Sequence, residues 1–130
     1  MVDASVAAKW FFQEEGSDRA DCLLGGPLVA PDLLHAEVAS IAWKRVRRGQ
    51  ISADLARREA AALIQMPIEI VPLTNLVSPA LHIAVEFDRS IYDSIYLALA
   101  VGRSLTFLTA DEKLVNSLAG TRLSSYVERL

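Results

Sequence analysis

Residues 90–111 decide the fold of this chain, and they read SIYDSIYLALAVGRSLTFLTAD. The segment predicts a mostly apolar helix over residues 91–101 and a short apolar strand over residues 105–108. Asp93 sits on a helix with almost no solvent-facing side, and an unpaired buried carboxylate costs on the order of several kcal/mol. We therefore expect a cation beside Asp93. Asp111 lies just past the end of the strand, where open parallel sheets place their binding sites.

Short apolar segments alternate with helical patterns along the rest of the sequence. The remaining strands are expected at residues 1–3, 28–30, 68–71 and 121–123. The remaining helices are expected at residues 4–12, 18–24, 32–48, 53–65, 78–86 and 111–118. Ser17 is the expected N-cap of the second helix. The alternation predicts an α/β fold, a three-layer α/β/α sandwich around a short parallel sheet of about four to five strands. A length of 130 residues predicts one domain.

Composition restricts the location of the protein. Hydrophobic residues make up 52% of the chain, but no apolar run reaches the roughly 18 to 20 residues of a membrane span. The first ten residues lack the basic and apolar regions of a signal peptide. Cys22 is the single cysteine, which excludes an internal disulfide and fits a reducing compartment. We therefore expect a soluble, cytoplasmic protein.

Charge is distributed unevenly along the sequence. The net charge is −3, the wrong sign for general attraction to a phosphate backbone. Six basic residues nevertheless cluster, as Lys44, Arg45, Arg47, Arg48, Arg57 and Arg58. This cluster fits a nucleic-acid contact, and it fits equally well a solvated helix end, because cations stabilise a helix C-terminus.

Four acids stand out by their predicted positions. Asp3 and Asp111 follow strands, whereas Glu37 and Asp93 lie on the apolar faces of helices. Each has a structural explanation, since the two strand-end aspartates could cap helices and residues 90–93 have the form of a capping box. Together, however, four carboxylates at one end of a small sheet repel one another. A divalent cation would offset that repulsion.

The types of residue indicate which ion such a site would bind. Oxygen ligands without a cluster of His or Cys select hard ions, Mg²⁺ or Mn²⁺. His35 and His82 are the only histidines and lie on different predicted helices, so neither is expected to bind the metal or act as a general base. Metal ions held by carboxylates can activate water for an in-line displacement at phosphorus. The four acids therefore predict a metal-assisted, in-line phosphoryl displacement.

Three segments and one inward acid carry a resemblance to a known family. VDASVAAKW at residues 2–10, Glu37, YDSIYLALA at residues 92–100 and LTFLTADEKL at residues 105–114 together resemble the PIN domain. The later two segments resemble the VapC-type toxins of bacterial and archaeal toxin–antitoxin pairs. The likeness covers residues 3 to about 115, although only Met1 and Val2 precede the first aspartate, fewer than in similar proteins.

The resemblance implies an activity, a cofactor and roles for individual residues. It implies an endoribonuclease dependent on Mg²⁺ or Mn²⁺ that hydrolyses RNA and leaves 5′-phosphate and 3′-hydroxyl ends. It further implies an antitoxin partner that masks the nuclease site, and we expect a homodimer. The metal-binding acids it implies are Asp3, Glu37, Asp93 and Asp111, with Ser5 and Thr109 as accessory hydroxyls that orient an acid or bind a metal-bound water.

Two other functions remain open at this point. The chain could be a catalytically weak or inactive PIN-like module that acts mainly by binding an antitoxin, in a groove formed by the helices over residues 32–48 and 53–65. A Mg²⁺-dependent phosphatase on a similar sheet is disfavoured, because no acid is followed by the nucleophile signature of such enzymes.

Overall fold

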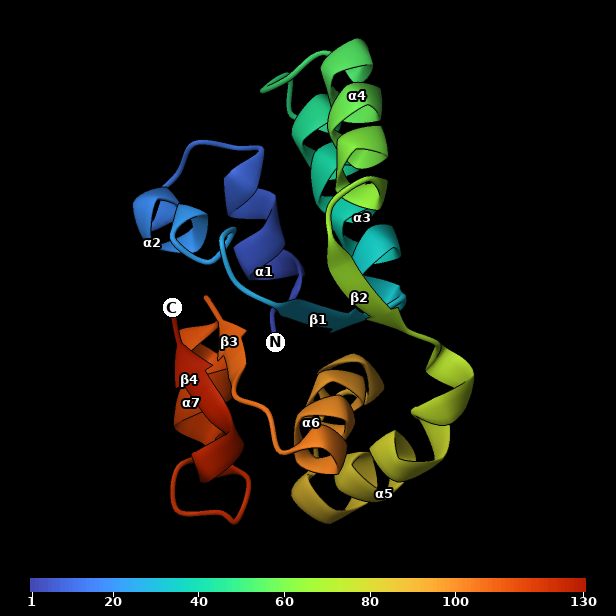
Figure 1. Cartoon of the computed structure of the whole chain (residues 1–130), viewed down its shortest axis with the longest axis vertical. Helices are drawn as coiled ribbons and strands as arrows, with labels where there is room; N and C mark the ends of the chain where they lie inside the picture. The colour runs from blue at the N-terminus through green and yellow to red at the C-terminus, as the bar shows by residue number, and fades with distance from the viewer.

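Two pairs of parallel strands meet at Val2 in the middle of the molecule. The computed structural model describes all of residues 1–130 (Figure 1). β1 (Leu28–Pro31) pairs with β2 (Ile68–Val71), and β3 (Phe107–Thr109) pairs with β4 (Val127–Arg129), both in parallel.

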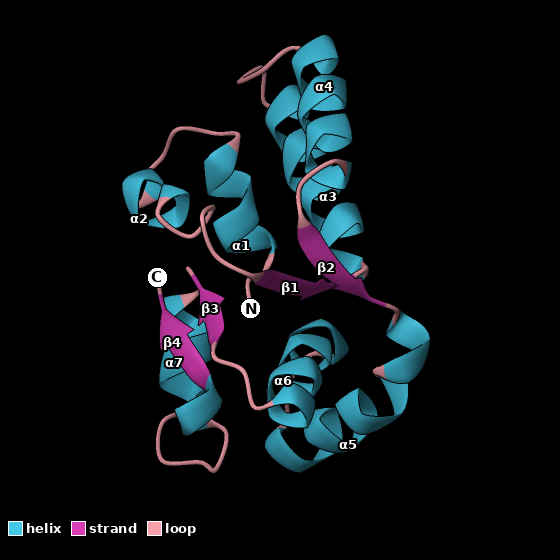
Figure 2. Cartoon of the chain, viewed as in Figure 1, coloured by secondary structure: helices cyan, strands magenta, loops and turns pink.

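Val2 joins the two pairs. It forms a parallel bridge with Leu108, and its N–H donates to the carbonyl of Val29 at 3.3 Å. On its other side, the N–H of Leu108 donates to the carbonyl of Met1 at 2.9 Å. The order across the molecule is therefore β2, β1, Val2, β3, β4, which matches the short parallel sheet that the sequence predicts. Figure 2 shows the two strand pairs on either side of the N-terminus.

Helices cover this sheet. The α-helices are α1 (Ala4–Ala7), α2 (Ser17–Asp21), α3 (Leu33–Arg47), α4 (Ala53–Ile64), α5 (Val77–Phe87), α6 (Ile91–Arg103) and α7 (Glu112–Leu118), and the short 3₁₀ turns are η1 (Ala8–Trp10), η2 (Leu73–Asn75) and η3 (Ser124–Tyr126). α3 and α4 pack side by side on one side of β1 and β2, and α5 and α6 pack together on the other (Figure 1). The α/β fold expected from the sequence is confirmed. None of these helices combines the length and apolar character needed to cross a membrane.

The core is built around α6, as its apolar sequence predicts. Every residue from Ser94 to Ala100 is buried, and these side chains pack with Ile83 of α5 and Leu118 of α7. The ring of Tyr96 stacks on that of Phe107 in β3, with centroids 5.3 Å apart. This packing fixes the start of α6 beside the ends of the strands.

Two local predictions are wrong. Gly16, not Ser17, is the N-cap of α2, because it adopts a left-handed conformation with φ of +84° that favours glycine. Ser17 is buried instead, where its hydroxyl donates to the carbonyl of Lys9 at 3.1 Å and accepts from the N–H of Glu14.

The last strand is also displaced from its predicted position. Residues 121–123 form a turn, because Thr121 is held to the end of α7 by two hydrogen bonds to the carbonyl of Leu118. The strand comes after η3, at β4, where the tail was expected. The predicted strand at residues 105–108 lies one to two residues later, at β3, so that Thr109 ends the strand and Asp111 follows it.

Candidate active site

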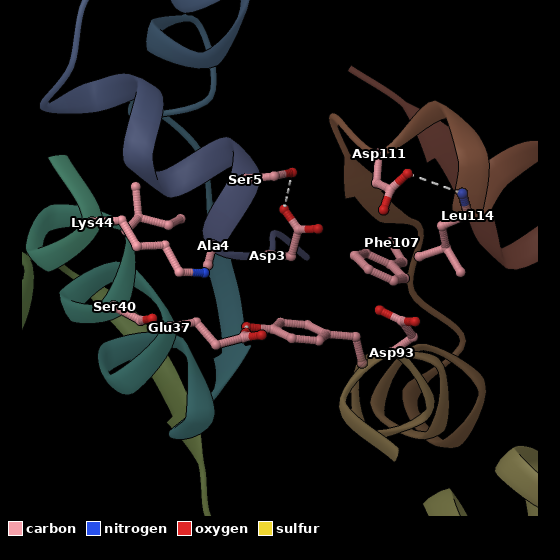
Figure 3. Close-up of a pocket in the computed structure, with 12 residues that line it drawn as sticks. Asp3, Ala4, Ser5, Glu37, Ser40, Lys44, Asp93, Phe107, Asp111 and Leu114 are labelled. Carbon is pink, nitrogen blue, oxygen red and sulfur yellow. Dashed lines mark hydrogen bonds between the residues drawn. The ribbon is translucent and has the colours of Figure 1, made fainter. Parts of the chain in front are cut away.

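A cavity of about 270 Å³ lies at the ends of the central strands and contains all four predicted acids (Figure 3). Asp3 comes from the segment after Val2, Glu37 from α3, Asp93 from the first turn of α6, and Asp111 from the residue before α7. The predicted hydroxyl residue Ser5 lines the same cavity. Segments far apart in the sequence therefore bring these side chains to one place.

Asp3 is the most firmly held of the four acids. Its Oδ1 accepts from the Ser5 hydroxyl at 2.6 Å and from the N–H of Val6 at 3.0 Å, which makes it the N-cap of α1. Its Oδ2 accepts from the Thr109 hydroxyl at 2.6 Å. Burial raises the pKa of Asp3 above its usual range, and these hydrogen bonds oppose that rise. Asp3 can therefore cap α1 and line the cavity at the same time. The hydroxyls of Ser5 and Thr109 both orient its carboxylate.

The same hydroxyls connect Asp3 to the loop that carries Asp111. The N–H of Asp111 donates to the Thr109 hydroxyl at 3.0 Å, and the N–H of Ala110 donates to the Ser5 hydroxyl at 2.8 Å. Asp111 itself caps α7, since its Oδ1 accepts from the N–H groups of Lys113 and Leu114. No protein group donates to its Oδ2, so that oxygen is available to a ligand.

Glu37 is paired with a residue that the sequence reasoning did not single out. The buried Tyr96 hydroxyl donates to Glu37 Oε2 at 2.7 Å. The signal was present, because Tyr96 follows Asp93 by three residues and so lies on the same face of the helix. Burial, together with the negative charge of Glu37, raises the pKa of Tyr96 above its usual range. Its hydroxyl therefore stays protonated and acts as a donor.

Burial also raises the pKa of Glu37 above its usual range. The Tyr96 hydrogen bond opposes this rise, and the charges of Asp3 and Asp93 add to it. The charges of two neighbouring acids thus act on Glu37 in the same direction as its burial.

Asp93 is held by its own helix cap. The Ser90 hydroxyl accepts from the N–H of Asp93 at 3.0 Å and donates to its Oδ2 at 2.7 Å. The acid thus bonds to the hydroxyl of the cap residue, whereas a full capping box would direct it to the backbone N–H. The sequence predicts a cation beside Asp93, but no Lys or Arg side chain forms an ion pair with it. None of the protein's ion pairs includes any of the four acids.

Lys44 is the one cation that lines the cavity, and its amino end points into it (Figure 3). It lies two turns beyond Glu37 on α3, with Ser40 between them on the same face. The sequence placed Lys44 in the basic cluster but did not connect it with the acids. Neither histidine lines the cavity.

The donor set matches a hard divalent cation in its chemistry. Carboxylate and hydroxyl oxygens line the cavity, with no imidazole or thiol, as Mg²⁺ and Mn²⁺ prefer. In this arrangement, however, no three acidic, histidine or cysteine side chains converge closely enough to hold one ion. The structure therefore shows an open acidic cavity with suitable ligands.

Comparison with known proteins agrees with the fold. The family model of the PIN domain matches residues 1–117, which include all four acids. Ribonuclease VapC3 of Pyrobaculum aerophilum is 30% identical over 118 residues, which cover 88% of this chain and 90% of that protein. The crystal structure of PAE2754 from Pyrobaculum aerophilum has a similar fold, with a TM-score of 0.69 and 22% identity over 92% of this chain and 79% of that one. The chain therefore belongs to the PIN-domain family and is of the VapC type.

Proposed function

We propose that the protein is an endoribonuclease that hydrolyses RNA phosphodiester bonds with Mg²⁺ or Mn²⁺, as the toxin of a VapBC-type toxin–antitoxin pair. The observation that carries the proposal is the gathering of four carboxylates from four elements around one cavity without a paired protein cation. The name of the relative, a ribonuclease, supports RNA as the substrate.

The four acids share one role in this proposal, and their hydrogen-bond partners have another. Asp3, Glu37, Asp93 and Asp111 would hold the ion or ions. A divalent ion bound among carboxylates activates water and stabilises charge on phosphate oxygens. Ser5 and Thr109 fix the two oxygens of Asp3, and the Tyr96 hydroxyl orients Glu37 and favours its charged form. These hydrogen bonds hold the carboxylates in place before an RNA strand binds, and they oppose the rise in pKa that burial causes.

The decisive substitution is Asp93→Asn, measured as Mg²⁺-stimulated cleavage of RNA by the purified protein. The amide retains an oxygen for the Ser90 hydroxyl but loses the charge that would face an ion. We expect cleavage to fall by at least about 100-fold, more than the effect typical of residues that only support metal ligands.

Ser94→Ala is the matched control on the same turn of α6. Ser94 is fully buried and its hydroxyl has no hydrogen-bond partner, so its removal should leave cleavage unchanged. Undiminished cleavage by the Asp93→Asn protein would show that the acids do not form the active site.

A second surface supports the toxin–antitoxin part of the proposal. α3 and α4 enclose an apolar groove of about 290 Å³, in which Trp43 remains 57% exposed. We propose that a helix of the antitoxin binds there.

On α5, Leu81 and Val85 are 57% and 77% exposed, and we propose that a second copy of the chain covers them in a homodimer. If the wild-type protein binds an antitoxin but cleaves no RNA, the inactive binding module is the correct function.

A further inference from the structure

A second hollow adjoins the acidic cavity along α3. It measures about 290 Å³ and is lined by Ile41, Lys44, Arg45, Arg48 and Gln50. Ile41 and Lys44 also line the acidic cavity, so the two hollows meet at these side chains. The second hollow has three cations and no acid on its walls, whereas the first has four acids and one cation.

The cations at the end of α3 are not equivalent. Arg45 is engaged, because its guanidinium binds Glu14 Oε2 at 2.5 Å and lies 4.5 Å from the centre of the Phe12 ring. Arg47 lies over the ring of Trp43 and lines neither hollow.

Lys44 and Arg48 differ from the other two. They are one turn apart, and neither forms an ion pair. A favourable interaction with the helix C-terminus would involve all four cations alike and does not explain this division.

An RNA strand needs cations beside the acidic cavity. The four carboxylates repel the phosphates on either side of the bond to be cut, and the net charge of −3 provides no general attraction. Unpaired Lys and Arg side chains bind phosphate oxygens, and Arg can do so through two N–H groups.

We propose that Lys44 and Arg48 form a phosphate track that receives the backbone of single-stranded RNA as it leaves the acidic cavity. The inference rests on the proposed nuclease function. It assigns the path of the RNA on the protein surface, which runs from the acidic cavity along α3 toward the C-terminus of that helix. The track recognises phosphate and not bases, so it contributes affinity without sequence preference.

The test compares Lys44→Ala, Arg48→Ala and the double variant with Arg47→Ala, which removes the same charge from the same helix end. Binding of a fluorescein-labelled single-stranded RNA is followed by anisotropy in EDTA, between about 50 and 200 mM salt. Each track variant should reduce the slope of log affinity against log salt by about 0.7, and the double variant by about twice that amount. Arg47→Ala should keep the wild-type slope, and Lys44→Arg and Arg48→Lys should restore it.

Several outcomes would overturn the track. These are no RNA binding by the wild type at the lowest salt, an unchanged slope in the double variant, or an equal loss in Arg47→Ala. In Mg²⁺, Arg48→Ala should raise KM and leave kcat unchanged, since Arg48 lies outside the acidic cavity. If RNA binding depends on Lys44 and Arg48 but Mg²⁺ stimulates no cleavage, the proposed nuclease function is wrong and the phosphate track stands. If the protein cleaves RNA and these variants change neither binding nor KM, the phosphate track is wrong and the nuclease function stands.

Discussion

Individual carboxylates in the cavity are placed at a cost to stability. Burial raises the pKa values of both Asp3 and Glu37 above their usual range, so the folded protein favours their protonated forms. When the pKa of a carboxyl is higher in the folded than in the unfolded protein, its contribution to the free energy of unfolding depends on pH. That contribution is fully present below the pKa of the unfolded protein and is lost as the pH rises through the pKa of the folded protein. At neutral pH without metal, both charges therefore destabilise the fold.

Glu37→Gln should separate stability from activity. The amide oxygen can still accept from Tyr96, but the charge that burial and the neighbouring acids disfavour is gone. Metal-free Glu37→Gln should melt at a higher temperature than the wild type at pH 7, and the difference should vanish below the unfolded pKa of Glu37. Cleavage in Mg²⁺ should fall by at least about 100-fold.

Thermal melts at pH 7 and at a pH below the unfolded pKa of Glu37 check this prediction. Glu128→Gln, on an exposed side chain without an ion pair, provides the control and should change neither quantity. A Glu37→Gln protein that melts below the wild type at pH 7 would contradict the electrostatic argument.

Among the elements, α3 serves two surfaces at once. Glu37, Ser40 and Lys44 face the acidic cavity, whereas Trp43 and its apolar neighbours face the groove against α4. The two stripes lie on different sides of one helix. An antitoxin helix in the groove would therefore lie beside the nuclease site without filling it, and further antitoxin residues would be needed to block the cavity.

Ala60→Glu should prevent capture of the antitoxin. Ala60 lines the groove, so a bound helix would bury the new carboxylate. The one cation of the groove, Arg57, is already paired with Asp54, so the cost should be several kcal/mol. We expect at least about tenfold weaker recovery of the co-expressed antitoxin on affinity purification. Ala61→Glu, exposed and outside the groove, is the control and should retain binding. Equal recovery with both variants would exclude the groove as the docking site.

The sequence predicted the elements well where burial pattern and length agreed. The helix around Asp93 and the strand before Asp111 were recognisable because their apolar runs admit only a buried position. The N-cap of α2 was missed because glycine and serine both favour caps, and only the fold shows that the Ser17 hydroxyl is needed elsewhere. The last strand was misplaced because Thr121 is held by α7, a contact that no local pattern reveals.

The sequence predicted which acids line the cavity, but it did not predict the partners of the side chains around them. The strand ends and inward helix faces identified all four carboxylates that line the cavity. The Tyr96 partner of Glu37 was missed because an aromatic residue on an apolar helix is usually only core. The division of the basic cluster could not be predicted, since it depends on Glu14, which is distant in sequence and pairs with Arg45.

For the whole molecule, divalent ions should act as a stabilising ligand. The acids lack paired cations, so an ion bound only by the folded protein raises its stability, by about 2.7 kcal/mol at 100 times the dissociation constant. We expect Mg²⁺ to raise the melting temperature of the wild type by several degrees and EDTA to reverse the effect. Asp93→Asn should respond less.

Sodium chloride at the same ionic strength separates binding from screening. Screening alone weakens repulsion between the acids and would act through any salt. An equal rise in melting temperature in sodium chloride and in Mg²⁺ would argue against a specific ion site.

The hydrogen bond between Asp3 and Thr109 spans 106 residues, and this has a consequence for biosynthesis. Because chains emerge from the ribosome N-terminus first, Asp3 is made long before the strand and loop that complete its surroundings. A nascent chain that ends near residue 100 carries Asp3, Glu37 and Asp93 but lacks both Thr109 and Asp111. Under the proposed nuclease function, catalysis would wait until translation has passed residue 111, and products that end before it would be inactive.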